Sequence, residues 1–141
     1  MTVEAIHLGE LESPQLRAVD SVSAVAGKGL EGDGRYFYED GAEPGRALTL
    51  VEAENVEAVG LAAGATRRQL TTRGVRLNDL VGKHFRVGEV ECYGVELCEP
   101  CTHLQSVTRP GIIKELTHGA GINADILTDG TISVGDEIVE V

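Results

Sequence analysis

The chain has 141 residues, of which 42% are apolar, and a formal net charge of −11. This length favours one domain, spanning residues 1–141, that buries roughly two-thirds of its unfolded surface. The acidic excess argues against a broad nucleic-acid surface and against binding to acidic membranes. The sequence contains no apolar run long enough to cross a bilayer and no signal-peptide pattern, so we expect a cytoplasmic protein.

The first half of the chain predicts short strands joined by tight turns, because its many glycines are interleaved with branched aliphatic residues. Acidic residues in the first turn and an apolar side predict a helix at residues 52–61. The glycine-rich stretch 27–45 is too irregular for one element and is expected to cover a site. Strands are predicted at residues 2–8, at 16–25 with a bulge, and at 46–51.

The second half continues the same pattern. Strands are predicted at residues 67–73, 83–95, 124–127 and 131–141, and a short helix at 110–116. The pair Asp129-Gly130 predicts a hairpin between the last two strands. Many short strands with few helices indicate a mainly β fold, a closed β-barrel with a few short helices.

The glycine-rich stretch contains Gly27-x-Gly29-x-x-Gly32, which matches the dinucleotide-binding pattern. That pattern binds a pyrophosphate only when a helix follows it, and the residues after Gly32 do not predict a helix. Asp33 would also repel a phosphate at this turn. The sequence therefore favours a loop that needs glycine geometry over a nucleotide site.

The segment Cys98-Glu99-Pro100-Cys101 is the strongest local signal for chemistry, because a thiolate can attack, carry sulfur or bind a soft metal. Four interpretations remain open. Cys98 and Cys101 could form a redox pair as in thioredoxin-like proteins, although the βαβ context that such a pair needs is not predicted in this chain. They could bind zinc together with His103 and a further ligand such as Cys92 or His118. Cys101 could act as a single reactive thiolate, or both cysteines could be buried and inert.

Taken in order, the motifs resemble those of the MOSC family, a module related to the C-terminal part of molybdenum-cofactor sulfurase. The resemblance covers nearly the whole chain, from about Gly27 to Val139. The segments that carry it are Gly29-Leu30-Glu31-Gly32-Asp33, Arg67-Arg68-Gln69-Leu70, Arg73-Gly74-Val75-Arg76-Leu77-Asn78, Phe85-Arg86-Val87-Gly88, Leu97-Cys98-Glu99-Pro100-Cys101-Thr102-His103-Leu104 and Gly130-Thr131-Ile132-Ser133-Val134-Gly135-Asp136.

The resemblance implies a barrel like the barrel domain of pyruvate kinase and a functional thiol at Cys101, which carries a persulfide or ligates molybdenum. It also implies a basic pocket for the phosphate of molybdopterin, a cofactor that a purified protein can lose. The family usually has Asn after its paired arginines, where this chain has Gln69. The expected cofactor-binding residues are Arg67, Arg68, Gln69, Asp33, Arg35 and His103.

Two functional hypotheses follow. In the first, the chain is a sulfur carrier or transferase served by a cysteine desulfurase, or a molybdenum-dependent reductase of N-hydroxylated compounds served by an electron-donor protein. Pyridoxal phosphate is not expected, because no lysine is placed to anchor it. In the second, the chain is a non-catalytic binding module stabilised by zinc or by thiols through Cys98, Cys101 and His103.

Overall fold

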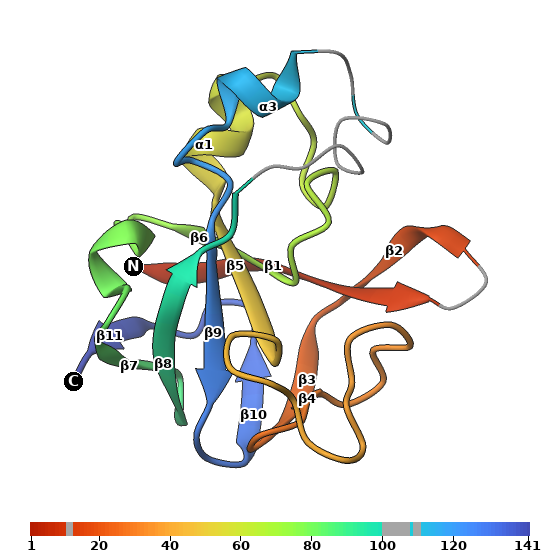
Figure 1. Ribbon diagram of the computed structural model, residues 1–141, viewed down its shortest axis with the longest axis vertical. Helices are drawn as coiled ribbons and strands as arrows, with labels where there is room; N and C mark the ends of the chain where they lie inside the picture. Colours follow the sequence, from red (N-terminus) through yellow and green to blue (C-terminus); the bar gives the residue numbers. More distant parts are fainter. Residues whose placement is uncertain (11–12, 100–107, 109–110) are drawn as a thin grey trace.

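The strands of this protein form two sheets that enclose the main hydrophobic core (Figure 1). The computed structural model describes residues 1–10, 13–99, 108 and 111–141. The strands are β1 (Thr2–Glu10), β2 (Ser13–Val19), β3 (Ser21–Val25), β4 (Gly29–Leu30), β5 (Leu48–Glu52), β6 (Leu70–Arg73), β7 (His84–Val87), β8 (Val90–Leu97), β9 (Ile122–Ile126), β10 (Gly130–Ser133) and β11 (Ile138–Glu140). The helices are α1 (Ala53–Ala58), the 3-10 helix η1 (Leu77–Leu80) and α3 (Ile112–Glu115).

The larger sheet has the strand order β11-β7-β8-β9-β5-β6-β1-β2, and the smaller one has the order β10-β3-β4. Neighbouring strands are antiparallel except β5 and β6, which are parallel and connected through α1. The fold is therefore mainly β, as predicted. Among the described strands neither sheet closes on itself, because the orders end at β11 and β2 and at β10 and β4. The predicted closed barrel is not confirmed.

Side chains from both sheets meet in the core. On β1, the side chains of Ile6 and Leu8 point into the core. Leu50 of β5, Leu70 of β6 and Ile122 of β9 are fully buried beside them. Burying one such side chain contributes about 1.5–3 kcal/mol to the stability of the fold. This apolar layer therefore helps to hold the central strands together. The polar residues that alternate with these positions lie on the other face of the sheet.

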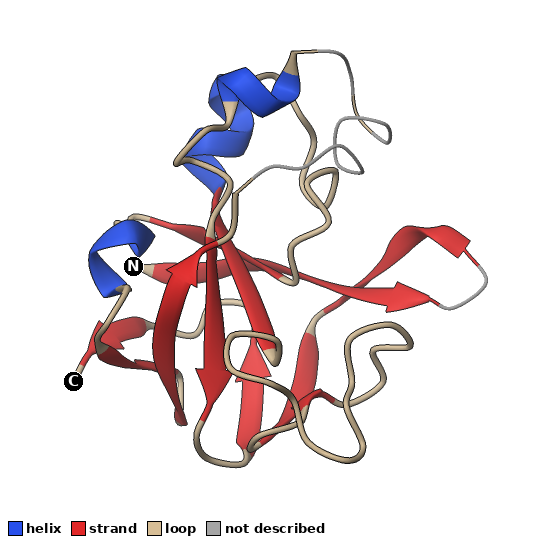
Figure 2. Ribbon diagram, viewed as in Figure 1, coloured by secondary structure: helices blue, strands red, loops and turns tan. Residues whose placement is uncertain are grey.

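The helices α1 and α3 lie together at one end of the molecule, beyond the strands (Figure 2). They share a second apolar cluster, in which Ile112, Leu116 and Ala120 pack against Val59 and Leu61. Within the described residues, no helix is both long and apolar enough to cross a membrane.

The strand predictions differ from the structure in several places. The expected strand at 83–95 is two antiparallel strands, β7 and β8, joined by a tight turn at residues 88–89. The expected strand at 16–25 is two strands, β2 and β3, separated by a bend at Asp20, so that one segment serves both sheets. The hairpin predicted at Asp129-Gly130 is wrong, because β9 pairs with β5 and β8 while β10 pairs with β3. The predicted strand 131–141 likewise divides into β10 and β11, which belong to different sheets.

Candidate functional site

A cavity of about 370 Å³ opens on the outer face of the large sheet, where β8, β9 and β5 adjoin the residues before β6. Its lining combines cations, hydroxyls, amides, one carboxylate and one thiol. The lining residues are Tyr36, Tyr38, Gly45, Arg46, Thr49, Arg67, Arg68, Gln69, Glu96, Cys98 and Asn123. This cavity contains three of the residues that the sequence analysis expected to bind a cofactor.

Arg68 is a buried cation that is held entirely by neutral partners. Its guanidinium group donates to the main-chain oxygens of Ala120 at 2.9 Å, Thr66 at 3.1 Å and Cys98 at 3.2 Å. Across the described part of the chain, no carboxylate oxygen lies within 4 Å of it. A buried charge is costly unless it is compensated, and a guanidinium has five N–H donors, of which three are used here. The geometry therefore favours an anion beside Arg68.

Arg67 precedes it in a left-handed backbone conformation, with φ of 63°. Such a conformation is uncommon for a residue with a side chain and costs of order 1–3 kcal/mol, so the surrounding structure must impose it. The predicted strand at 67–73 starts only at Leu70, so Arg67 and Arg68 lie before the strand and not in it. Both side chains line the same cavity.

Gln69 links strand β5 to the glycine-rich loop through hydrogen bonds to Thr49 and Asp33. Its Oε1 accepts a hydrogen bond from the Thr49 amide at 3.0 Å, and its Nε2 donates to Oδ2 of Asp33 at 2.9 Å. The Gln69 amide in turn donates to the Thr49 hydroxyl at 3.0 Å. Asp33 also accepts from the amides of Arg35 at 2.9 Å and Tyr36 at 2.8 Å. The longer side chain of Gln69 thus bridges β5 and the glycine-rich loop.

The glycine-rich loop carries Tyr36 and Tyr38 to the cavity wall. Apart from the two-residue strand β4 it is irregular, and the residues after Gly32 form no helix, so the helix N-terminus that a dinucleotide site needs does not follow Gly27, Gly29 and Gly32. Gly29 has a φ of 136°, and a Cβ there would lie 2.7 Å from the main-chain oxygen of Tyr36. Only glycine permits this close approach.

The two described cysteines, Cys92 and Cys98, differ in environment. Cys92 is fully buried, and burial raises the pKa of its thiol to about 12, which keeps it protonated and inert. Cys98 is half-buried at the rim of the cavity, and its amide donates to the Gly121 oxygen at 2.8 Å. Cys101, the predicted functional thiol, lies outside the described residues, as does His103.

The other predicted residues occupy different places. Asp33 is buried behind the cavity, where it supports Gln69 and Tyr36. Arg35 is exposed, does not line the cavity, and donates from Nε to the main-chain oxygen of Glu10 at 2.6 Å. Its predicted cofactor contact is not seen at this cavity.

Two alternative interpretations of the cysteine pair are a thioredoxin-like redox pair and a zinc site. A βαβ unit exists, contrary to expectation, but it is β5-α1-β6 and not the neighbourhood of Cys98, which follows β8. The described residues contain no group of three or more His, Cys, Asp and Glu side chains placed to hold a metal ion. Two of the predicted zinc ligands, Cys101 and His103, lie outside the described residues, so the zinc site stays a prediction.

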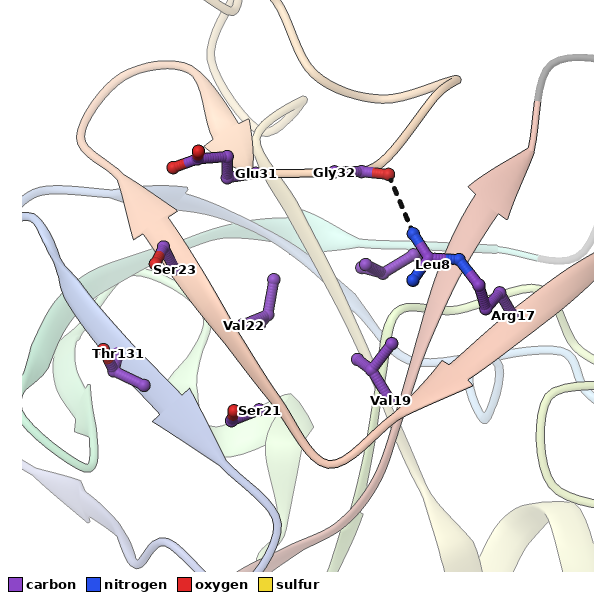
Figure 3. Close-up of a pocket in the computed structure, with 9 residues that line it drawn as sticks. All are labelled: Leu8, Arg17, Val19, Ser21, Val22, Ser23, Glu31, Gly32 and Thr131. Atoms are coloured by element: carbon purple, nitrogen blue, oxygen red, sulfur yellow. Dashed lines mark hydrogen bonds between the residues drawn. The ribbon is translucent and has the colours of Figure 1, made fainter.

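A second hollow, of about 480 Å³, lies between the β1–β2 hairpin and the small sheet. Figure 3 shows the Arg17 side chain reaching toward the Gly32 oxygen at its edge, a hydrogen bond of 3.2 Å. Arg17 also forms an ion pair with Glu10 at 2.7 Å, so its charge is already neutralised. The cation on this hollow is therefore paired with a carboxylate, unlike Arg68, and the other charged residue on its lining is the acidic Glu31.

Several cavity residues were missed by the sequence analysis. Thr49 and Asn123 are polar residues within apolar strands, and this alternation could have revealed them as positions on the outer face. Alternation could not have revealed Glu96, because the register of β8 against β9 shifts between Gly94 and Glu96 and breaks the pattern set by the buried Val90, Cys92 and Gly94. Tyr36, Tyr38 and Arg46 lie in irregular segments, where no periodicity predicts the direction of a side chain.

Comparisons with known proteins agree with this architecture. No curated protein matches the chain. Among solved structures, the YuaD protein from Bacillus subtilis aligns with a TM-score of 0.79 at 16% identity, over 97% of this chain and 93% of that one. YiiM from Geobacillus stearothermophilus aligns with a TM-score of 0.75 at 19% identity, over 99% and 74%. YiiM from Escherichia coli aligns with a TM-score of 0.75 at 21% identity, over 100% and 70%.

At these identities the structural alignments show a shared fold. The sequence itself matches the model of the MOSC domain over residues 41–139, which include the paired arginines, Gln69 and the cysteine segment. This chain belongs to the MOSC domain family.

Proposed function

We propose that the cavity binds the anionic end of a molybdopterin-type cofactor and that Cys101 carries the associated chemistry. MOSC domains are linked to molybdenum-cofactor function in general. The observation that carries the proposal is the buried guanidinium of Arg68, which lines the cavity with no carboxylate partner among the described residues. It lies directly against the main chain at Cys98, three residues before Cys101.

The residues present fit the phosphate of such a cofactor. Arg67 and Arg68 supply planar guanidinium groups, which bind phosphate through paired N–H donors, and Arg46 adds a third cation on the lining. Thr49 accepts a hydrogen bond from Gln69, and its own hydroxyl proton remains available to a ligand oxygen. When bound, the molybdenum centre supplies two-electron redox chemistry.

A sulfur-carrier role would need only the Cys101 thiolate and a persulfide donor. The Cys101 thiolate would attack the outer sulfur of a persulfide on a cysteine desulfurase, forming a new S–S bond. The bond between the two sulfurs of the donor breaks, its cysteine leaves as a thiolate, and Cys101 becomes the persulfide. The cationic cavity would then hold the anionic acceptor of that sulfur. An oxidoreductase role would require an electron-donor protein in place of the desulfurase.

Binding of inorganic pyrophosphate, measured by calorimetry at low and high salt, tests the anion site. We expect Arg67→Gln and Arg46→Gln to weaken binding about tenfold each, because each removes a charged contact. Arg86→Gln is the matched control, since Arg86 is exposed on β7 and does not line the cavity. Equal affinities in all four proteins would overturn the proposal for the cavity.

Transfer of radiolabelled sulfur from a cysteine desulfurase tests the thiol. The label should appear on wild-type protein and on Cys98→Ala and should be absent from Cys101→Ala. Mass spectrometry of the peptide that contains residues 98–101 locates the added sulfur. A Cys101→Ala protein that is labelled as fully as the wild type would remove Cys101 from the proposal.

A further inference from the structure

Four polar side chains form a row across adjacent strands on the outer face of the large sheet. Glu96 of β8 pairs with Asn123 of β9, and Asn123 pairs with Thr49 of β5. Thr49 in turn exchanges hydrogen bonds with Gln69, directly before β6. Their neighbours Ile122, Leu50 and Leu70 are fully buried in the core, so the row faces the other way and lines the cavity.

Charges of opposite sign lie on the lining of the cavity. Arg68 lies beyond the row, against the main-chain oxygens of Cys98 and Ala120, and presents hydrogen-bond donors. Glu96 is the second-last residue of β8 and lies two residues before Cys98. Two residues of extended chain separate their main-chain positions by roughly 6.6 Å. One cavity therefore carries both the buried cation of Arg68 and the carboxylate of Glu96 on its lining.

The Glu96 end is rich in acceptors. Asn123 Nδ2 donates to Glu96 Oε1 in a long hydrogen bond of 3.4 Å, which leaves the Asn123 carbonyl oxygen as a further acceptor. Within the described ranges, no cationic nitrogen lies within 4 Å of the Glu96 carboxylate. The Tyr36 and Tyr38 rings line the same cavity, and aromatic faces attract planar groups and cations.

We propose that Glu96, with Asn123, selects ligands that carry an N–H-rich group, such as a guanidinium or an amino-substituted ring, opposite an anionic group held at the arginines. The inference rests on the proposed anion site and adds the second half of the ligand. A carboxylate accepts two parallel N–H bonds from a planar group, which gives this end its selectivity.

Calorimetry with 4-guanidinobenzoate and benzoate tests this assignment on the full chain. Both probes carry the anion, and only the first carries the N–H-rich group. We expect wild-type protein to bind 4-guanidinobenzoate about tenfold more tightly than benzoate. Glu96→Gln should reduce that preference to about twofold, measured as the ratio of the two affinities in the same protein. Glu91→Gln, an exposed carboxylate on the same strand outside the cavity, should keep the full preference.

The possible results distinguish a failure of the Glu96 assignment from a failure of the anion site at the arginines. If wild-type protein binds both probes equally, the Glu96 assignment is overturned and the anion site stands. If Glu96→Gln keeps the tenfold preference, the assignment is also overturned. If wild-type protein binds neither probe nor pyrophosphate, the anion site fails and the Glu96 assignment fails with it. Arg67→Gln should weaken both probes by the same factor, since both share the carboxylate.

Discussion

Arg68 donates a hydrogen bond of 3.2 Å from its guanidinium group to the main-chain oxygen of Cys98. The residue that supplies the buried charge of the cavity therefore also anchors the end of β8, from which the segment toward Cys101 departs. A ligand that binds Arg68 would lie close to that segment. The cavity and the cysteine segment are thus joined through one side chain.

Replacing Arg68 should destabilise the protein strongly. In Arg68→Gln the oxygens of Ala120, Thr66 and Cys98 lose their shared donor, and we expect the free energy of unfolding to fall by about 2–4 kcal/mol. Urea titration measures this change. Arg76→Gln is the control, because its side chain is 87% exposed, and it should stay within about 0.5 kcal/mol of wild type. Equal midpoints for Arg68→Gln and Arg76→Gln would contradict this role.

Asp33 and Gln69 should be energetically coupled. The bond from Gln69 Nε2 to Asp33 Oδ2 is buried, 2.9 Å long and made to a charged group. A double-mutant cycle with Asp33→Ala and Gln69→Ala should give a coupling free energy of about 1–2 kcal/mol. A parallel cycle with Asp33→Ala and the distant Glu91→Ala should be additive within about 0.5 kcal/mol. A coupling no larger than that of the control cycle would show that the loop does not depend on Gln69.

Two glycines of the same motif should respond differently to alanine. Gly27 has a φ of 70° but open space where the Cβ of an alanine would lie, so Gly27→Ala should cost about 1–2 kcal/mol from backbone conformation alone. At Gly29 the Cβ would also lie 2.7 Å from the Tyr36 oxygen, so Gly29→Ala should cost at least about 1 kcal/mol more. Thermal unfolding monitored by circular dichroism ranks the pair, and the reverse order would refute the close approach at Tyr36.

Cys92 should make stability fall at high pH. The pKa of its thiol is raised to about 12 in the fold, while the unfolded thiol ionises near about 8.5. Its contribution is therefore complete below about pH 8.5 and declines as the pH rises toward 12, by at most about 1.4 kcal/mol per pH unit. Urea titrations at pH 8 and pH 10 should show a larger loss for wild type than for Cys92→Ala.

Alkylation provides a second readout for Cys92. In a Cys98→Ala/Cys101→Ala protein, only Cys92 remains to react with iodoacetamide. At pH 8 the folded protein should stay unmodified, and addition of urea should expose the thiol to complete reaction. Rapid labelling of the folded double variant would show that Cys92 is accessible.

The sequence by itself determined the local features of this protein. The alternation of apolar and polar residues predicted β1, β5 and the β7–β8 region, and acidic residues with an apolar side predicted the helix near 52–61, of which α1 is the ordered centre. The motif order identified the family that the domain match confirms. The expectation that no helix follows residues 27–32 is also confirmed. Each of these depends on residues that are close together along the chain.

Only the tertiary structure decided which strands pair and which side chains share a cavity. Asp129-Gly130 has strong hairpin chemistry, yet β10 pairs with β3, because its buried Ile132 packs in the core with residues of both sheets. Likewise, Glu96, Asn123, Thr49 and Gln69 are separated in sequence and become one row only through the register of four neighbouring strands. The partners of Arg68 are main-chain oxygens, which are present at every residue and carry no sequence signal. Long-range register and main-chain recognition are therefore what the sequence could not reveal.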